Sequence, residues 1–320
     1  NTQGGVNGRR IELVKRNDYG DADSAIRVAN ELYASDVVAV IGHSFSGPTL
    51  AASPIYNAGS RPVLQISPSA SSPALSEAGA YTFRVCPSDL AHGTALARWV
   101  RGRLNLTHGA VLYANNGYGR GIRQTFVAEF TRLNGTTVSM DPFLGDPPEV
   151  APYLERIAQN QQAQFIILAG YENDALAVLR AARVWGVEVP VLGGDGLEQV
   201  GRFGSIADST YMTGAYFPTI DNPANRSFVA RYRDRFPTGA PPNQSAAGSW
   251  DALHMLAELL RDVGTDREAL RDAVAEVGGD RPAYQGLTRK IAFDPEGDLE
   301  TEQVFVAMYR DGAKIVMEGQ

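Results

Sequence analysis

The chain has 320 residues, of which 44% are hydrophobic and 20% are charged, and its formal net charge is −7. This length favours two packed cores over one. The acidic balance argues against nucleic acid as a partner, because nucleic-acid binding needs a basic surface. No apolar stretch of the sequence approaches the roughly 20 residues of a membrane span. The single cysteine, Cys86, excludes an internal disulfide and a cysteine-based metal cluster, and we expect it to be buried.

Strand and helix patterns alternate along the first part of the chain, which predicts βαβ units and mostly parallel sheets. Acidic residues at 21 and 23 precede an apolar stripe of helical spacing, as is typical of a helix start. The predicted elements are a strand at 11–14, a helix from about 22 to 32, strands at 37–41, 62–66 and 81–86, and a helix at 91–103.

The alternation continues through the second part, and three longer helical patterns follow it. Strands are predicted at 110–113, 138–140, 165–169, 191–193 and 211–215, and helices at 119–133, 150–159, 174–185, 225–236, 245–263 and 267–277. The tail is predicted to be a β-hairpin of residues 291–293 and 304–309 around a Pro/Gly turn at 294–298.

Two serine-rich segments are the strongest functional signal. One spans residues 42–47 after the predicted strand at 37–41, and the other spans residues 67–73 after the strand at 62–66. In an open parallel sheet, ligands bind outside the carboxyl ends of the strands. Backbone N–H groups and the positive end of a following helix favour an anion there. The two segments therefore predict a site for a small acidic ligand.

Three further side chains follow predicted strands in the second half. Tyr118, Tyr171 and Asp195 each come directly after an apolar run, and Asp195 stands among three glycines. The functional interpretation of Asp195 is a carboxylate that faces a ligand cation such as an ammonium group. The alternative is a carboxylate that stabilises its own turn, and each tyrosine alone is more often a packing residue.

Enzyme and cofactor sites are weakly supported. Residues 42–46 come one residue short of the nucleophile elbow of α/β-hydrolases, and Asp195 and His254 follow Ser44 in the order that a triad needs. However, Gly47 comes one place too late, and His254 lies within a helical pattern. Neither glycine-rich run (117–121 and 193–196) has dinucleotide-binding spacing, and the four histidines lack metal-ligand spacing. We expect no enzyme activity, no metal and no cofactor.

The ordered motifs of this chain resemble a known family. They are Gly4-Gly5-Val6-Asn7-Gly8-Arg9, Val38-Ala39-Val40-Ile41-Gly42, Ala52-Ser53-Pro54-Ile55-Tyr56, Ile66-Ser67-Pro68-Ser69-Ala70-Ser71-Ser72-Pro73, Tyr118-Gly119-Arg120-Gly121, Leu168-Ala169-Gly170-Tyr171 and Leu192-Gly193-Gly194-Asp195-Gly196. Over nearly its whole length the chain resembles the type I periplasmic substrate-binding proteins of branched-chain amino-acid transport, the leucine/isoleucine/valine-binding type.

The resemblance implies an α/β fold of two Rossmann-like lobes with mostly parallel sheets, joined by a three-crossover hinge that closes on a ligand. Lobe 1 would comprise residues 1–88 and 219–297, and lobe 2 residues 89–218 and 298–320. Members of the family carry a further strand and helix before the Gly-Gly segment, and that strand would be central in the lobe 1 sheet. We therefore expect lobe 1 of this chain to lack them, and we expect an upstream segment before Asn1.

The resemblance also assigns roles to residues of the predicted site. Ser46 and Ser71 would hold a ligand carboxylate, the Ser69 carbonyl would accept from an α-ammonium group, and Asp195 would pair with that group. Tyr118 and Tyr171 would close over the ligand. The remaining positions expected to line it come from the same two loops, namely Ser44, Phe45, Ser67 and Ala70. Small residues at 246–248 suggest a roomier side-chain pocket than leucine needs.

The implied function is capture of an amino acid or a similar small polar ligand and its delivery to an ABC permease of the branched-chain amino-acid type. This function places the chain in the periplasm or outside the cell, where its only contact with a membrane would be through the permease. An aromatic carboxylate or a short amide is the alternative ligand. A ligand-sensing domain of a receptor or regulator is the alternative role.

Overall fold

The computed structural model describes residue 1 and residues 4–317, and the chain forms two compact units. Unit 1 comprises Asn1–Ser88 and Tyr216–Glu302, and unit 2 comprises Asp89–Ala215 and Gln303–Gln320. The chain thus passes between the units after residues 88, 215 and 302, against expected crossings after residues 88, 218 and 297.

Unit 1 is built on a parallel sheet in the order β1-β2-β3, with Ile41 paired to Ile66 and Ile66 paired to Phe83. A separate antiparallel pair, β9 and β10, lies elsewhere in the unit. The elements of unit 1 are α1 (Ala22–Tyr33), β1 (Ala39–Ile41), α2 (Ser46–Tyr56), β2 (Leu64–Ser67), η1 (Pro73–Glu77), β3 (Thr82–Arg84), α7 (Pro223–Arg235), α8 (Gln244–Val263), α9 (Arg267–Ala275), β9 (Tyr284–Gln285) and β10 (Lys290–Ile291).

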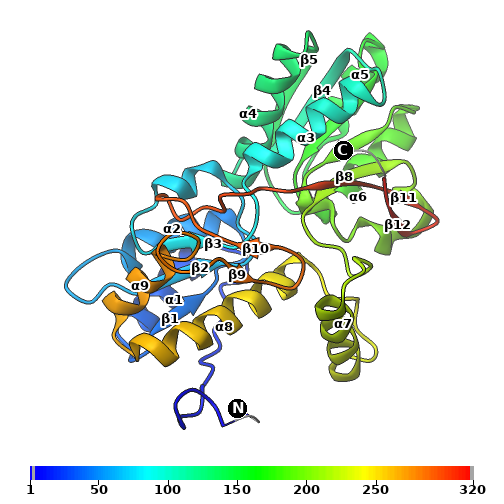
Figure 1. Ribbon diagram of the computed structural model, residues 1–320. Helices are drawn as coiled ribbons and strands as arrows, with labels where there is room; N and C mark the ends of the chain where they lie inside the picture. Colours follow the sequence, from blue (N-terminus) through cyan, green and yellow to red (C-terminus); the bar gives the residue numbers. More distant parts are fainter. Residues whose placement is uncertain (2–3, 318–320) are drawn as a thin grey trace. The chain divides into compact units, whose positions relative to one another are not determined.

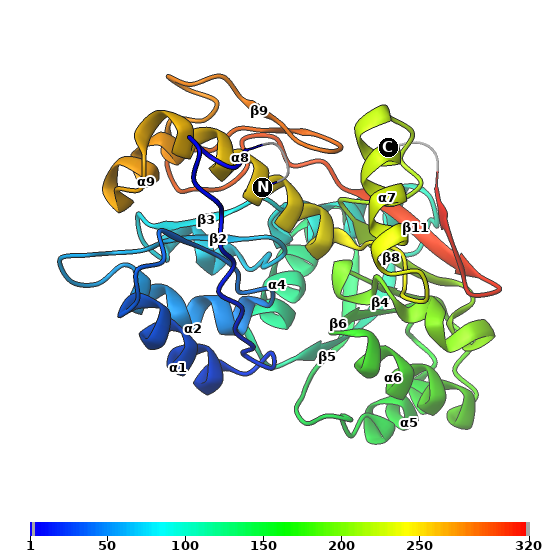
Figure 2. The same cartoon turned by 90° about the horizontal axis from the view of Figure 1, so that it is seen from below.

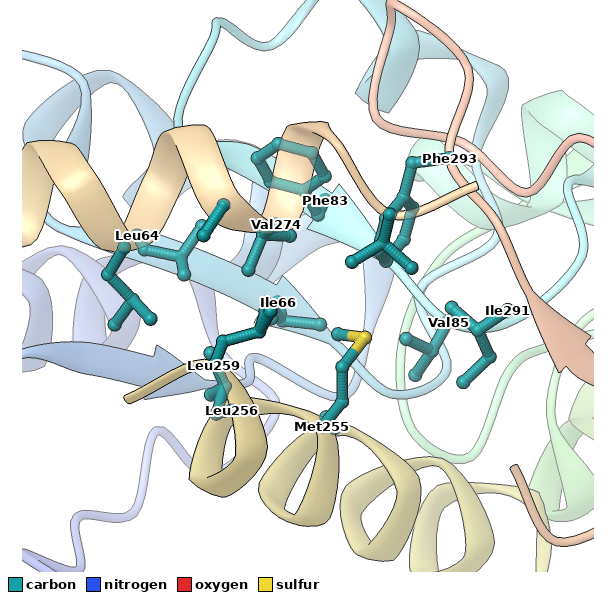
Figure 3. Close-up of a cluster of buried hydrophobic side chains, with 14 of the residues drawn as sticks. Leu64, Ile66, Phe83, Val85, Met255, Leu256, Leu259, Val274, Ile291 and Phe293 are labelled. Carbon is teal, nitrogen blue, oxygen red and sulfur yellow. The ribbon is translucent and has the colours of Figure 1, made fainter. Parts of the chain in front are cut away.

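The core of unit 1 has one apolar layer on each face of this sheet. Because side chains of a strand alternate between faces, Leu64 and Ile66 pack against α8 and α9, whose Met255, Leu256 and Val274 belong to the same buried cluster (Figure 3). Gln65 points the other way, toward α2, where it accepts a hydrogen bond from the Ser53 hydroxyl (2.9 Å). On that face Ala29, Val40 and Tyr56 join α1 and α2 to the sheet.

Helix α1 shows how local sequence positions these layers. The Asp21 carboxylate accepts from the Ser24 N–H (2.8 Å) and so caps the first turn. Ala25, Ala29 and Leu32 recur at helical spacing and are buried. The predicted helix is confirmed.

Unit 2 contains a seven-stranded sheet in the order β12-β11-β8-β7-β6-β4-β5 (Figure 1). Strand β11 runs antiparallel to β8 and β12, and all other pairs are parallel. The elements of unit 2 are α3 (Asp89–Gly102), β4 (His108–Ala114), α4 (Gly117–Arg132), β5 (Thr136–Phe143), α5 (Ala151–Asn160), β6 (Phe165–Ala169), α6 (Glu172–Trp185), β7 (Val191–Gly193), η2 (Asp195–Leu197), η3 (Val200–Ala207), β8 (Thr210–Gly214), β11 (Phe305–Arg310) and β12 (Ala313–Val316).

Strand β6 is buried along its whole length, as a central strand of a parallel sheet should be. Phe165 and Ile167 pack against Leu96 of α3 and Phe126 of α4. The intervening residue, Ile166, is also fully buried and points to the opposite face. The parallel strands bring the ends of β4, β6 and β7 to the same edge, which is where Tyr118, Tyr171 and Asp195 follow.

The strand predicted at 11–14 is wrong. Residues 10–18 form no regular element (dark blue in Figure 2), and Leu13 and Val14 are exposed. Strand β1 is the edge of its sheet, and a cavity of about 890 Å³ is lined both by residues 9–16 and by residues 35–41. The segment has the composition of a strand, but it makes no ladder pair with any strand of the described residues.

The hairpin predicted for the tail is also wrong. Lys290 and Ile291 pair with β9 in unit 1, whereas β11 pairs with β8 and β12 in unit 2. The turn at 294–298 exists, since the Asp294 N–H donates to the Asp298 carbonyl (2.9 Å). The chain leaves unit 1 after that turn, so the two apolar runs on either side of it join different sheets.

Asp251 of α8 is a buried acid in unit 1. Its carboxylate accepts from the Leu287 N–H (2.9 Å), and burial raises its pKa to about 6. The native state therefore binds this proton more tightly than the unfolded chain does, for which the ordinary value is 3.8. The contribution of Asp251 to stability is greatest below pH 4 and is lost as pH rises through 6.

We predict that Asp251→Asn removes this pH dependence. The difference in unfolding free energy between variant and wild type should shift in favour of the variant by roughly 2–3 kcal/mol between pH 4 and pH 7. Urea denaturation at four pH values measures it. The exposed Asp280 provides the control, because Asp280→Asn should give a flat difference. An equally flat difference for Asp251→Asn would contradict the prediction.

Candidate functional site

The two serine-rich segments of unit 1 are joined to each other. We call residues 42–46 the first serine loop and residues 67–72 the second. Three hydrogen bonds connect them: the Ser67 hydroxyl donates to the His43 carbonyl (2.6 Å), the Ser69 hydroxyl donates to the Ser44 carbonyl (2.8 Å), and the Ser72 N–H donates to the Ser46 hydroxyl (3.2 Å). Several of the predicted serines therefore fix the shape of the loops.

Donor groups for an anion remain at this end of the sheet. The Ser71 hydroxyl is buried and has no hydrogen-bond partner among the described residues. Helix α2 begins at Ser46, and its N-cap residue Phe45 makes no side-chain cap. Ser44 and Phe45 are exposed, whereas Ser67 and Ala70 are fully buried. A buried hydroxyl without a partner is costly, and a ligand oxygen would satisfy it.

Helix α8 packs directly on the second serine loop. The Ser245 hydroxyl donates to the Ser69 hydroxyl (2.7 Å). A Cβ on Gly248 would lie only 2.6 Å from the Pro68 carbonyl oxygen, so the backbones approach too closely for any larger residue. Gly248 is one of the small residues that suggested a roomier ligand pocket, but in the structure its small size allows α8 to pack on the second serine loop.

Arg84 lies behind the second serine loop and was not singled out from the sequence. Its buried guanidinium donates to the carbonyls of Ser71 (3.0 Å) and Ser72 (2.8 Å) and to the carboxylate of Asp298. An arginine inside an otherwise apolar strand was the available signal, because a buried charge needs partners.

Tyr118, Tyr171 and Asp195 come together in unit 2. The rings of Tyr118 and Tyr171 stack with centroids 5.0 Å apart. The Tyr118 hydroxyl accepts from the N–H of Gly196, which follows Asp195 in the chain (2.8 Å). Tyr118 lies in the first turn of α4, Tyr171 caps α6, and Asp195 begins η2. The strand-end argument thus placed these three residues correctly relative to one another.

The electrostatics of this cluster are those of a buried acidic site. Burial raises the pKa of Tyr118 well above its usual value, and the carboxylates of Asp195 and Asp89 raise it further. Burial, Asp89 and Asp195 likewise raise the pKa of Tyr171. Both phenols therefore keep their protons at physiological pH. A cation placed beside them would find negative charge and aromatic faces.

Two supporting residues of unit 2 were missed. His92 of α3 is fully buried, its Nδ1 lies 2.9 Å from the Thr213 hydroxyl, and its Nε2 lies 3.9 Å from the Asp195 carboxylate. Asp174 accepts from the Tyr171 N–H (2.8 Å), and burial raises the pKa of Asp174 to about 6. From the sequence, His92 was only one of four histidines without metal-ligand spacing, because no local pattern links it to Asp195.

The histidine that the hydrolase alternative needs is held within a helix. His254 lies within α8, where its ring stacks on Trp250 and its Nδ1 lies 2.8 Å from the Trp250 carbonyl. Within residues 1 and 4–317, no group of three His, Cys, Asp or Glu side chains is arranged to hold a metal ion.

The parallel sheets of two units with polar loops at the strand ends define a ligand-binding protein of the type I periplasmic binding fold. The periplasmic binding protein family model matches residues 1–314, and the chain belongs to this family. It is a solute-binding protein of the kind that serves ABC transporters, and not an enzyme. The predicted family and fold are confirmed.

Three similar proteins illustrate the range of the family. A Leu/Ile/Val-binding protein homolog of Brucella suis is 27% identical over an alignment of 320 positions, which covers 98% of this chain and 83% of the relative. A substrate-binding protein of Desulfitobacterium hafniense, solved with leucine, is 25% identical with a TM-score of 0.83 over 99% of this chain and 91% of that one. A solute-binding protein of R. palustris, solved with benzoate, is 20% identical with a TM-score of 0.86 over 99% and 87%.

Across the described part of the chain, every helix is too short or too polar to cross a membrane.

We predict that Tyr118→Phe destabilises unit 2 by about 1 kcal/mol, because the Gly196 N–H loses its acceptor beside Asp195. Thermal and urea unfolding measure the loss. Tyr153→Phe is the matched control, since the half-exposed Tyr153 hydroxyl donates to the Pro142 carbonyl (2.8 Å) and water can replace it. Equal losses of unfolding free energy in the two variants would contradict the prediction, because the bond from the Gly196 N–H would then contribute no more than an exposed one.

Proposed function

We propose that this protein captures a small solute that carries a carboxylate and an ammonium group, an amino acid in the first place. The observation that carries the proposal is that one chain offers both donors for an anion and a carboxylate for a cation. Unit 1 offers hydroxyl and N–H donors at the serine loops, and unit 2 offers the Asp195 carboxylate beside two tyrosines. In this proposal both sets of residues contact one ligand.

The roles follow from these groups. Ser46 and Ser71 receive the carboxylate, and the Ser69 carbonyl and the Asp195 carboxylate receive the ammonium group. Tyr118 and Tyr171 cover the ligand. Ser44, Phe45, Ser67 and Ala70 complete the loops that surround it. Charge-assisted hydrogen bonds of this kind contribute about 1.5–3 kcal/mol each.

The cellular role in this proposal is delivery of the ligand to an ABC permease of the branched-chain amino-acid type, outside the cytoplasm. The leucine-bound Desulfitobacterium protein supports this substrate class by similarity. We propose that the two lobes, which correspond to the two units apart from residues 216–218 and 298–302, move about the chain crossings when the ligand binds.

An aromatic carboxylate is the second candidate, because a protein of this fold was solved with benzoate. Such a ligand has no cation for Asp195, whose side chain is only 9% exposed. An ammonium group would add a charge-assisted contact to this carboxylate, and an aromatic acid has no such group. The presence of Asp195 therefore favours the amino acid.

We predict that a calorimetric screen finds binding of one or more aliphatic amino acids, and that two substitutions separate the two ends of the ligand. Asp195→Asn should weaken amino-acid binding by about 10- to 100-fold. Its effect on the deaminated acid of the same side chain should be less than threefold. Ser71→Ala should weaken both ligands alike.

The exposed Asp311 of unit 2 supplies the control, since Asp311→Asn should leave both affinities unchanged. Binding of benzoate by wild type, improved in Asp195→Asn and without any amino-acid binding, would replace the first candidate with the second. Binding of neither class would end the proposal.

A further inference from the structure

The side chain of Arg84 makes an unusual set of contacts for a strand residue. It is 1% exposed, and it leaves β3 to reach the inner side of the second serine loop. One guanidinium nitrogen, Nη1, donates to the carbonyls of both Ser71 (3.0 Å) and Ser72 (2.8 Å). The other, Nη2, contacts the Ser76 hydroxyl (3.3 Å) and the Asp298 carboxylate.

These contacts fix the peptide between Ser71 and Ser72 from both sides. Its carbonyl is held by Arg84, and its N–H is held by the Ser46 hydroxyl (3.2 Å). The Ser71 side chain leaves the Cα at one end of this peptide, and its hydroxyl has no hydrogen-bond partner among the described residues. The loop is therefore held in one shape by groups that come from β3 and α2.

Asp298 connects the same guanidinium to a distant part of the chain. The Arg84 N–H donates to the Gly297 carbonyl (3.1 Å), and the Ser76 hydroxyl donates to Asp298 (2.6 Å). Nearby, the Ser88 N–H donates to the Glu302 carboxylate. Residues 84–88 and 297–302 are thus tied together just where the chain leaves unit 1, after residues 88 and 302.

We propose that Arg84 is a positioning residue for ligand binding, which holds the second serine loop in the shape that presents Ser71 to the ligand carboxylate. Asp298 is the counter-ion that makes a buried guanidinium tolerable at this place. The carbonyl contacts, and not the charge pair, hold the loop. The ligand role of the loop rests on the function proposed above, whereas its fixed shape does not.

Arg84→Lys tests the proposal, because an ammonium group keeps the charge but cannot span two carbonyls and a carboxylate as the planar guanidinium does. Arg267→Lys is the matched control. Arg267 lies in the same unit and donates to the carbonyls of Val37 (2.9 Å), Arg61 (2.9 Å) and Ser35 (2.7 Å), at the amino end of β1 and away from the serine loops. Both variants should lower the melting temperature.

Two measurements distinguish positioning from general stability. Calorimetry with leucine, or with whichever amino acid the screen finds, should show a Kd at least tenfold higher for Arg84→Lys and a less than twofold change for Arg267→Lys. Amide hydrogen exchange without ligand should be at least tenfold faster at Ser71 and Ser72 in Arg84→Lys and unchanged there in Arg267→Lys. Affinity losses that follow the melting temperature equally in both variants would overturn the proposal.

Asp298→Asn is a second, milder variant that retains an acceptor for Nη2 and leaves both loop carbonyls with Arg84. It should lower stability, yet change the Kd by less than threefold and leave Ser71 and Ser72 exchange unchanged. A loss of affinity as large as that of Arg84→Lys would overturn the role of the carbonyl contacts. If wild type binds no amino acid, the proposed function fails, and the exchange measurement alone still decides whether Arg84 fixes the loop.

Discussion

A guanidinium that is almost completely removed from water needs acceptors, and in this protein the acceptors of its two Nη nitrogens shape the end of a sheet. Its Nε has no hydrogen-bond partner among the described residues. Arg84 has carbonyl, hydroxyl and carboxylate partners drawn from the second serine loop, η1 and the turn at 294–298. Removing any one partner would leave a buried charge short of an acceptor, which is far more costly than the loss of a surface ion pair. The second serine loop, β3 and the turn at 294–298 are therefore held together by one side chain, although they are distant in the sequence.

The two serine loops depend on the same constraint. Parallel pairing of β1 with β2 brings their carboxyl ends side by side, and hydroxyls of one loop then satisfy backbone groups of the other. Three of the six serines in the two loops, Ser46, Ser67 and Ser69, make these bonds with their hydroxyls. The peptide beside Ser71 is held by Arg84 and Ser46, whereas the Ser71 hydroxyl has no partner among the described residues. In the proposed function, a donor that such a network holds in place before the ligand arrives reduces the entropy lost on binding.

Local patterns predicted most of the fold because each βαβ unit carries its own signals. Asp21 caps α1 where the acidic residues indicated a helix start, and the apolar runs of β4, β6 and β7 became adjacent strands. Strand pairing could not be predicted in the same way. Residues 11–14 have a strand-like composition without a partner, and the run at 304–309 pairs with β8 rather than with 291–293. In both cases the deciding contact lies outside the segment.

The candidate site likewise contains some residues that could be grouped from the sequence and others that could not. Tyr118, Tyr171 and Asp195 could be grouped from the sequence because strand ends of one parallel sheet meet at one edge. Arg84 and Asp298, 214 residues apart, could not be paired, since no local pattern links them. His92 was equally hidden, because only the packing of α3 against β8 sets it between Thr213 and Asp195.

The division of labour between the units has a consequence for specificity. Hydroxyl and N–H groups can donate to any carboxylate, whether it belongs to an amino acid or to an aromatic acid. Such groups in unit 1 therefore discriminate little between the two classes of ligand. In the proposed function, Asp195 favours a ligand that carries a cation, because an ammonium group beside its carboxylate gains a charge-assisted contact. One fold can therefore serve leucine in one protein and benzoate in another. In the proposed function, the choice in this chain rests on the acid that follows β7, and the serine loops supply the part of the site that both ligands need.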